Sequence, residues 1–232
     1  MWAQTSEVKL FDPLLVASRE VIERLALVAD THAYQAGLPA LLDFFQSQGL
    51  RHLVCLGDCP PEPFRPWLTM GPEHRLYWIY DVFGPQLPEA TASGIALEVT
   101  SRVFLAHTRA LIWTHFNERI RAYSHGPRAY RPPLLACHGH THVPCVTRFT
   151  PPFSRILYIN DALRPEEFQA RQACLSLDPD TAYLIVPGAF TLEERRYPTF
   201  SFAVLDLAAS RVAMVSLKDL QDLSAVELFP PE

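Results

Sequence analysis

The 232-residue sequence has no run of about 18 to 20 consecutive apolar residues, the length that a membrane-spanning helix requires. Its first residues show no basic stretch followed by an apolar core, so we expect no secretory signal. A disordered chain is also excluded, because 49% of the residues are hydrophobic and only 19% are charged. These absences predict a soluble protein of the cytoplasm, with no membrane partner.

The sequence also lacks a dense cluster of basic residues and any Cys-x-x-Cys pair. Its 20 Lys and Arg stand against 25 Asp and Glu, which gives a net charge of −5. A protein that neutralises nucleic-acid phosphates would normally present a basic face, so a nucleic-acid partner is not expected. The five cysteines are odd in number, and without an export signal they are expected to be reduced, mostly buried thiols.

Short apolar runs recur along the chain, and several of them are followed by an Asp or His. Such runs, bounded by turns, are typical of strands that are buried on both faces of a sheet. Residues 38–48 have apolar side chains on one side and end before Gly49, which predicts a crossover helix between two parallel strands. The runs with their polar followers are Leu25–Ala29 with Asp30, Leu53–Leu56 with Asp58, Leu76–Tyr80 with Asp81, Val103–Ala106 with His107, and Leu134–Cys137 with residues 138–142.

The carboxyl ends of these strands are expected to form one site, because ligands of α/β sheets gather beyond the carboxyl ends of the strands. A single Asp in such a place is commonly a turn or cap residue. Five strand ends that all carry Asp or His favour a shared function instead.

The rest of the chain is expected to complete a single domain over residues 1–232, with residues 1–24 as an N-terminal extension that includes a short helix near its end. Ile95–Val99 and Val103–Ala106 should form a hairpin, and Phe200–Leu207 should pair with Arg211–Leu217. Residues 110–124 have helical spacing. Residues 143–181 are rich in proline and are expected to be an irregular insertion, apart from a strand at 156–159 and a helical piece at 165–174. This insertion would either shape the pocket or pair two copies of the chain into a homo-oligomer.

The strongest local motif is His138-Gly139-His140-Thr141-His142. Histidines at i, i+2 and i+4 point the same way on an extended backbone, and neutral imidazole is the commonest transition-metal ligand. Asp30-Thr31-His32 has the same i, i+2 spacing directly after a strand, and a carboxylate beside an imidazole suits Mn, Fe, Zn or Ni.

In their order along the chain these motifs resemble the calcineurin-like metallophosphoesterase superfamily, and most closely its small bacterial and archaeal phosphodiesterase branch. The resemblance extends over residues 24–217 and includes Pro187-Gly188-Ala189-Phe190, which is similar to the family's Asn-Pro-Gly-Ser turn. It implies an α/β fold, a four-layer α/β/β/α sandwich of two mixed β-sheets flanked by helices. It also implies two divalent transition-metal ions at one edge of the paired sheets.

The resemblance further implies a role for each matching residue. Asp30, His32 and His142 would hold one ion, Asp58 would bridge both ions, and His107 and His140 would hold the second. Such enzymes hydrolyse a small phosphate-ester substrate through a metal-bridging hydroxide, while the two ions clamp the phosphoryl oxygens.

The sequence departs from the family where a Gly-Asn-x-Asp motif is expected, and two alignments are open there. Aligned on the strand end, Asp81 replaces the metal-binding Asn, and Val82 replaces a His that assists the leaving group. Shifted by two, Ile79 and Tyr80 take these places, and the second ion lacks a ligand. We favour the first alignment because it keeps an oxygen ligand after the apolar strand. Two smaller departures are Val186 for the turn Asn, and Thr108 for the Gly that usually follows the family's His.

These departures bear on the expected activity. A third carboxylate at Asp81 would hold the second ion more firmly but lower its attraction for phosphate. With no general acid in place of the missing His, the site would suit phosphodiesters with good leaving groups. Two alternatives remain: a catalytically weak or inactive relative that binds a metal or a partner, and a nuclease of the same superfamily.

Overall fold

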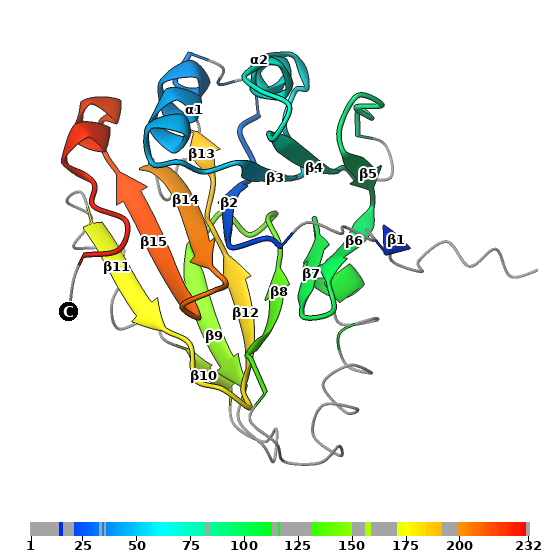
Figure 1. The fold of residues 1–232 in the computed structure, drawn as a ribbon, viewed down its shortest axis with the longest axis vertical. Helices are drawn as coiled ribbons and strands as arrows, with labels where there is room; N and C mark the ends of the chain where they lie inside the picture. The colour runs from blue at the N-terminus through cyan, green and yellow to red at the C-terminus, as the bar shows by residue number, and fades with distance from the viewer. Residues whose placement is uncertain are drawn as a thin grey trace, which may run out of the picture.

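A computed structural model describes residues 14–15, 21–32, 34, 36–81, 84–112, 116, 131–149, 156–158, 171–191 and 199–230. Their strands form two mixed sheets that pack face to face (Figure 1). The expected sandwich of two mixed sheets is confirmed.

The larger sheet has eight strands, and one side of it is a parallel set formed by β2, β3, β4 and the edge strand β5. Antiparallel strands extend it on the other side of β2, in the order β14, β15 and β11, and β13 pairs with β14. The strands are β2 (Arg24–Val28), β3 (His52–Leu56), β4 (Arg75–Ile79), β5 (Ala92–Gly94), β11 (Arg171–Ser176), β13 (Phe190–Thr191), β14 (Thr199–Asp206) and β15 (Arg211–Leu217).

The second sheet has seven strands in the order β1-β6-β7-β8-β12-β9-β10. Its central strands β7, β8 and β12 are parallel, and β6 forms the expected antiparallel hairpin with β7. The strands are β1 (Leu14–Leu15), β6 (Ala96–Thr100), β7 (Val103–Ala106), β8 (Leu134–Cys137), β9 (Cys145–Phe149), β10 (Ile156–Tyr158) and β12 (Ala182–Val186).

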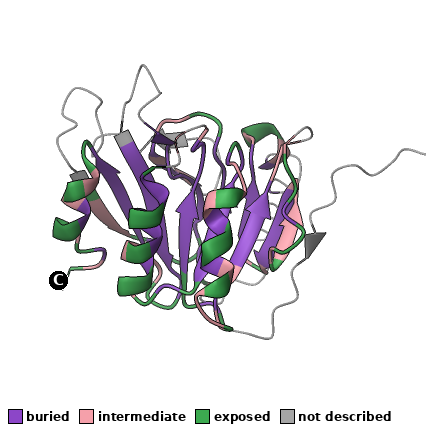
Figure 2. Ribbon diagram, turned by 90° about the horizontal axis from the view of Figure 1, so that it is seen from above, coloured by how far each residue is buried: buried purple, intermediate pink, exposed green. Residues whose placement is uncertain are grey.

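Successive side chains of a strand point to opposite faces of its sheet, so each strand contributes to two different cores. In β2, Leu25 and Leu27 join the core between the two sheets, whereas Ala26 and Val28 join the core beneath the helices. That second core includes the buried face of α1 (Leu38–Ser47) and Trp67 of α2 (Arg65–Thr69), with the short 3-10 helices η1 (Glu62–Phe64) and η3 (Leu220–Ala225) beside them. Figure 2 shows the strands almost wholly buried and the helices exposed on their outer sides.

A smaller core covers the outer face of the second sheet. Helical residues 109–112 and Phe116 lie there, and Ile112 and Phe116 pack against Phe104 of β7 and Ala136 of β8. The other residues of the helix expected at 110–124 lie outside the described residues. In the described part of the chain, no helix is long and apolar enough to cross a membrane.

Residues 143–181 differ from the irregular insertion that was expected. Besides β10 (Ile156–Tyr158), which lies where a strand was expected at 156–159, they supply β9 to the same sheet and β11 to the other. Residues 171–174 of the expected helical piece lie in β11, because the edge of β15 offers six paired positions that outweigh a weak helical pattern. Residues 165–170 lie outside the described residues. At the other end of the chain, Arg24 already belongs to β2, β1 pairs with β6, and residues 16–20 of the expected short helix are not described.

The two parallel sets determine where the site lies. β2, β3 and β4 run parallel in one sheet, and β7 and β8 run parallel in the other, so the carboxyl ends within each set share one edge. Asp30 and His140 are joined across the two sheets by a hydrogen bond. The polar residues that follow the strands therefore gather at one end of the sandwich.

Candidate dinuclear metal centre

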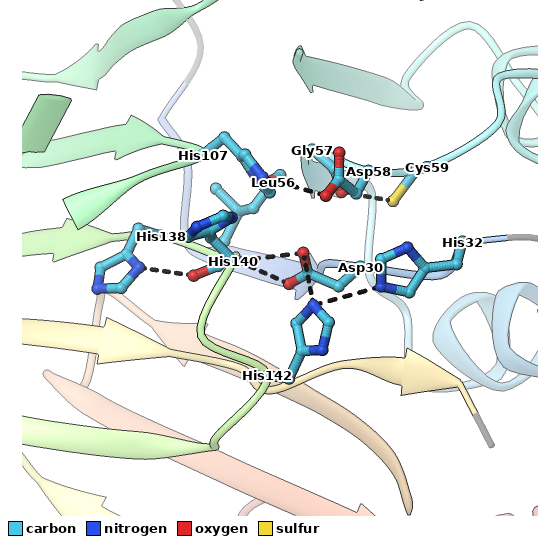
Figure 3. Close-up of polar contacts among 11 residues, drawn as sticks. Asp30, His32, Leu56, Gly57, Asp58, Cys59, His107, His138, His140 and His142 are labelled. Atoms are coloured by element: carbon cyan, nitrogen blue, oxygen red, sulfur yellow. Dashed lines mark hydrogen bonds and ion pairs between the residues drawn. The ribbon is translucent and has the colours of Figure 1, made fainter. Parts of the chain in front are cut away.

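The first group of possible metal ligands consists of Asp30, His32 and His142, whose ligand atoms all lie within 4.8 Å of one another. The Nε2 atoms of His32 and His142 are 3.3 Å apart, and Nε2 of His142 lies 3.5 Å from Oδ1 of Asp30 (Figure 3). Asp30 is fully buried, whereas both histidines are half-buried. A fully buried carboxylate that faces two imidazole nitrogens is a suitable site for a cation.

The second group consists of Asp58, His107 and His140, again within 4.8 Å of one another. Nε2 of His107 lies 3.4 Å from Oδ2 of Asp58, and the rings of His107 and His140 contact each other edge to face. His107 is buried, whereas Asp58 and His140 are exposed. This group is therefore accessible to solvent at Asp58 and His140.

Hydrogen bonds tie the two groups together. The backbone N–H of His140 donates to both carboxylate oxygens of Asp30, at 3.1 and 2.9 Å. The backbone N–H of His32 donates to the carbonyl of Asp58 at 2.9 Å, and that of Asp30 donates to the carbonyl of Gly57 at 3.0 Å. Each group thus helps to position a residue of the other, as expected of one centre with two sites.

The backbone of the ligand residues is strained in the same way at five of six positions. Asp30, His32, Asp58, His140 and His142 have φ between 47° and 66°, and only two other described non-glycine residues have a positive φ. Each such residue costs about 1–3 kcal/mol, and such strain concentrates at functional sites. The five positions all lie in the short loops that follow β2, β3 and β8.

Two glycines allow the strand ends to approach one another. Gly57 has a φ of 95°, and a Cβ there would lie 2.5 Å from Cγ of His107. A Cβ on Gly139 would lie 2.8 Å from Oδ2 of Asp30 and 2.9 Å from the carbonyl oxygen of Leu56. The sequence analysis did not assign these roles, and the signal available was a glycine next to an expected ligand in both motifs.

One buried nitrogen atom, Nε2 of His107, has the properties of a metal ligand. Nδ1 of His107 lies 2.6 Å from the carbonyl oxygen of Leu56. A carbonyl only accepts, so Nδ1 carries the hydrogen and Nε2 presents its lone pair toward Asp58. That Nε2 is buried and has no hydrogen-bond partner. A bare nitrogen beside a carboxylate is suited to a divalent transition metal, so the residues present fit such an ion.

Asp81, the remaining expected ligand, belongs to neither group. It follows β4 and is half-buried, and its carbonyl accepts a hydrogen bond from the N–H of Gly84 at 2.8 Å. Val82, which takes the place of the assisting His in the favoured alignment, lies outside the described residues. A direct metal role for Asp81 stays a prediction.

His138 belongs to neither group either, although it lies in the same histidine motif. Its ring points away from both groups in Figure 3, and its Nδ1 donates to the carbonyl of Gly139 at 2.7 Å. Burial lowers the pKa of His138 to about 4, so the ring is neutral at neutral pH. Burial also raises the pKa of the Cys55 thiol well above its ordinary value, and Cys59 contributes in the same direction, in keeping with reduced, buried thiols.

No protein-family model matches the chain, and no curated protein is similar to it in sequence. Among solved structures it is similar to an archaeal phosphodiesterase, with a TM-score of 0.51 and 13% identity over 84% of this chain and 99% of that one. A metallophosphoesterase from Sphaerobacter thermophilus gives a TM-score of 0.48 at 18% identity, over 88% of this chain and 92% of that one. A phosphoesterase from E. coli gives 0.46 at 14% identity, over 79% of this chain and 88% of that one. The chain therefore shares the fold of the archaeal phosphodiesterase, and the fold expected from the sequence is confirmed.

Proposed function

We propose that the protein is a dinuclear metal-dependent phosphoesterase that hydrolyses phosphodiesters. The observation that carries the proposal is the pair of three-residue groups, Asp30 with His32 and His142, and Asp58 with His107 and His140. The two groups lie at the end of the sandwich where the polar residues that follow the strands gather. The backbone N–H of His140 in one group donates hydrogen bonds to the carboxylate of Asp30 in the other. The similarity in fold to a phosphodiesterase supports this assignment.

Each residue has a definable task in this proposal. Asp30 is held by two hydrogen bonds and offers its remaining lone pairs to the first site. Asp58 lies beside His107, and its carbonyl accepts from His32 of the other group, which places it to serve both sites. Two divalent ions about 3.5–4 Å apart would supply a nucleophile from water at neutral pH and neutralise the phosphoryl oxygens.

Two features lead us to expect a preference for diesters: the negative charge of Asp81, and the lack of a His that could act as a general acid. Asp81 would reduce the positive charge that faces the phosphoryl group, which disfavours a doubly charged monoester more than a singly charged diester. Without a His to protonate the leaving group, the reaction depends on a leaving group that departs unassisted. Diesters of phenols meet both requirements.

The experiment is a turnover assay of the metal-free protein after addition of Mn²⁺, Ni²⁺, Zn²⁺ or Mg²⁺. We expect hydrolysis of bis(p-nitrophenyl) phosphate with at least one transition metal, and slower hydrolysis of p-nitrophenyl phosphate. Faster monoester turnover would contradict the diester preference. Binding of two ions without turnover of either ester would show an inactive relative instead.

A separate prediction concerns Asp81. With Asp58 shared, the first site has four protein ligands, and Asp81 would give the second site four as well. Asp81→Ala is therefore expected to reduce metal content from about two ions per chain to about one and to abolish most turnover. Asp81→Asn keeps a neutral oxygen, so it should retain the second ion less firmly and keep its turnover when metal is in excess. Metal analysis and turnover of both variants decide the matter, since two unchanged variants would mean that Asp81 is not a ligand.

A further inference from the structure

A cavity of about 190 Å³ lies on the outer side of the histidine motif, and its wall is partly formed by the loops that carry the expected ligands. Its lining residues are Arg109, His138, Thr141, Val143, Cys145, Thr147, Leu184 and Val186. Building on the proposed function, we propose that this cavity is a substrate subsite that receives the organic group which stays on phosphorus during hydrolysis.

The cavity and the metal centre share two short loops. Arg109 follows His107 by two residues, His138 precedes His140 by two, and Thr141 lies between His140 and His142. Neighbouring Cα atoms are about 3.8 Å apart, so these lining residues begin within about 8 Å of a ligand residue. The same two loops therefore form part of the cavity wall and carry three of the six residues of the metal groups, although none of those six residues lines the cavity itself.

Two buried polar residues line this cavity beside the exposed Arg109. His138 is 1% exposed and lines the cavity. Because its Nδ1 donates to the Gly139 carbonyl, its Nε2 is a hydrogen-bond acceptor. The buried Thr147 adds a hydroxyl group. The positive charge of Arg109 at the rim favours a substrate that carries an anionic phosphoryl group.

The floor of the cavity is apolar and rigid. Leu184 and Val186 alternate along β12, and they pair directly with Thr147 and Cys145 of β9. Leu184 also packs in the core that includes Phe104 and Phe116, and this packing fixes the position of its side chain. Mostly apolar walls with a few converging polar groups are typical of small-molecule sites.

The volume limits what the cavity can hold. An apolar cavity of about 150 Å³ is large enough for one benzene ring. A cavity of about 190 Å³ therefore has room for one ring-sized substituent. In the hydrolysis of a diester, the bond from phosphorus to the leaving oxygen breaks and a bond to a water oxygen forms. The second ester group stays attached throughout, and it is this group that the cavity would select.

The test compares two diesters with the same p-nitrophenolate leaving group, benzyl p-nitrophenyl phosphate and methyl p-nitrophenyl phosphate. Burial of the ring should give the benzyl ester a kcat/KM at least about tenfold higher than the methyl ester. Cys145→Phe narrows the cavity, and we expect it to reduce this ratio to about one. The matched control is Cys174→Phe, because Cys174 is also a half-buried, reduced cysteine but lies on β11 of the other sheet. Cys145→Leu adds less volume and should give an intermediate ratio if the phenylalanine variant fails to fold.

A binding measurement separates this inference from the proposed function. Benzylphosphonate should raise the melting temperature of the metal-free protein and of Cys174→Phe, but not that of Cys145→Phe, and methylphosphonate should raise none of them. If no metal supports turnover, the proposed function fails and this binding result alone decides the role of the cavity. Equal values of kcat/KM for both esters in the wild type, or a ratio unchanged in both Cys145 variants, would overturn the subsite. A change in turnover that is equal for both esters would instead make the cavity an effector site and would also overturn it.

Discussion

Asp58→Asn is expected to remove at least one metal ion per chain and to lower phosphodiester turnover by about a hundredfold or more. Loss of a residue that merely orients a ligand already costs about 10–100-fold, and Asp58 is assigned to both sites. Asparagine keeps the shape of the side chain but offers one neutral oxygen where the carboxylate offers two charged ones. The unpaired charge of the ions would then be poorly compensated. Metal analysis and turnover of the purified variant measure both effects.

Asp180→Asn is the matched control for this substitution. Asp180 is also an exposed turn residue with a positive φ, 55° compared with 49° for Asp58, but it belongs to neither metal group. Asparagine tolerates this backbone conformation, so any general effect of the substitution should appear in the control as well. Full metal content and turnover in Asp58→Asn would show that Asp58 is only a turn residue.

Gly57→Ala is expected to abolish binding of the second ion and to lower turnover by about a hundredfold. The added Cβ would lie 2.5 Å from Cγ of His107. The His107 ring cannot move away easily, because it is 1% exposed and its Nδ1 is bonded to Leu56. We expect an additional loss of about 3 kcal/mol in the free energy of unfolding, from overpacking and from the positive φ.

Gly49→Ala separates the steric effect from backbone strain. Gly49 also has a positive φ, 69°, but a Cβ there would meet nothing within 4 Å. This variant should lose only about 1 kcal/mol of stability and keep its metal content and turnover. Denaturant unfolding, metal analysis and turnover of both variants provide the comparison. Equal effects on metal content would mean that Gly57 does not position His107.

The strands that carry the site could be predicted from the sequence, because each is a continuous apolar run that ends at a polar residue. Leu53–Leu56 and Leu134–Cys137 are examples, and the structure has β3 at His52–Leu56 and β8 at Leu134–Cys137. β9 and β11 were not predicted. Residues 145–149 and 171–176 include polar side chains and are strands because they pair with β12 and β15, which are distant in the sequence. Strands of this kind depend on their neighbours in the sheet more than on their own composition.

The ligand groups were predicted by residue type and by order along the chain, but their geometry was not. The sequence shows that Asp30 and His140 follow strands; it does not show that the N–H of His140 binds both oxygens of Asp30. The positive φ values at five ligand positions were not predicted either, because Asp and His adopt this conformation more often than most residues but still in only a minority of cases. The cavity lined by His138 also depends on the register of β9 against β12, which pairs Thr147 with Leu184 and Cys145 with Val186. Local sequence does not encode this register.

The central claim is that the two groups hold two ions, and anomalous diffraction from crystals grown with Mn²⁺ tests it most directly. We expect two anomalous peaks per chain. One should lie within about 2.0–2.2 Å of ligand atoms of Asp30, His32 and His142, and the other equally close to ligand atoms of Asp58, His107 and His140. The absence of any peak at these six residues, with Mn²⁺ in excess and the side chains otherwise in place, would contradict the account.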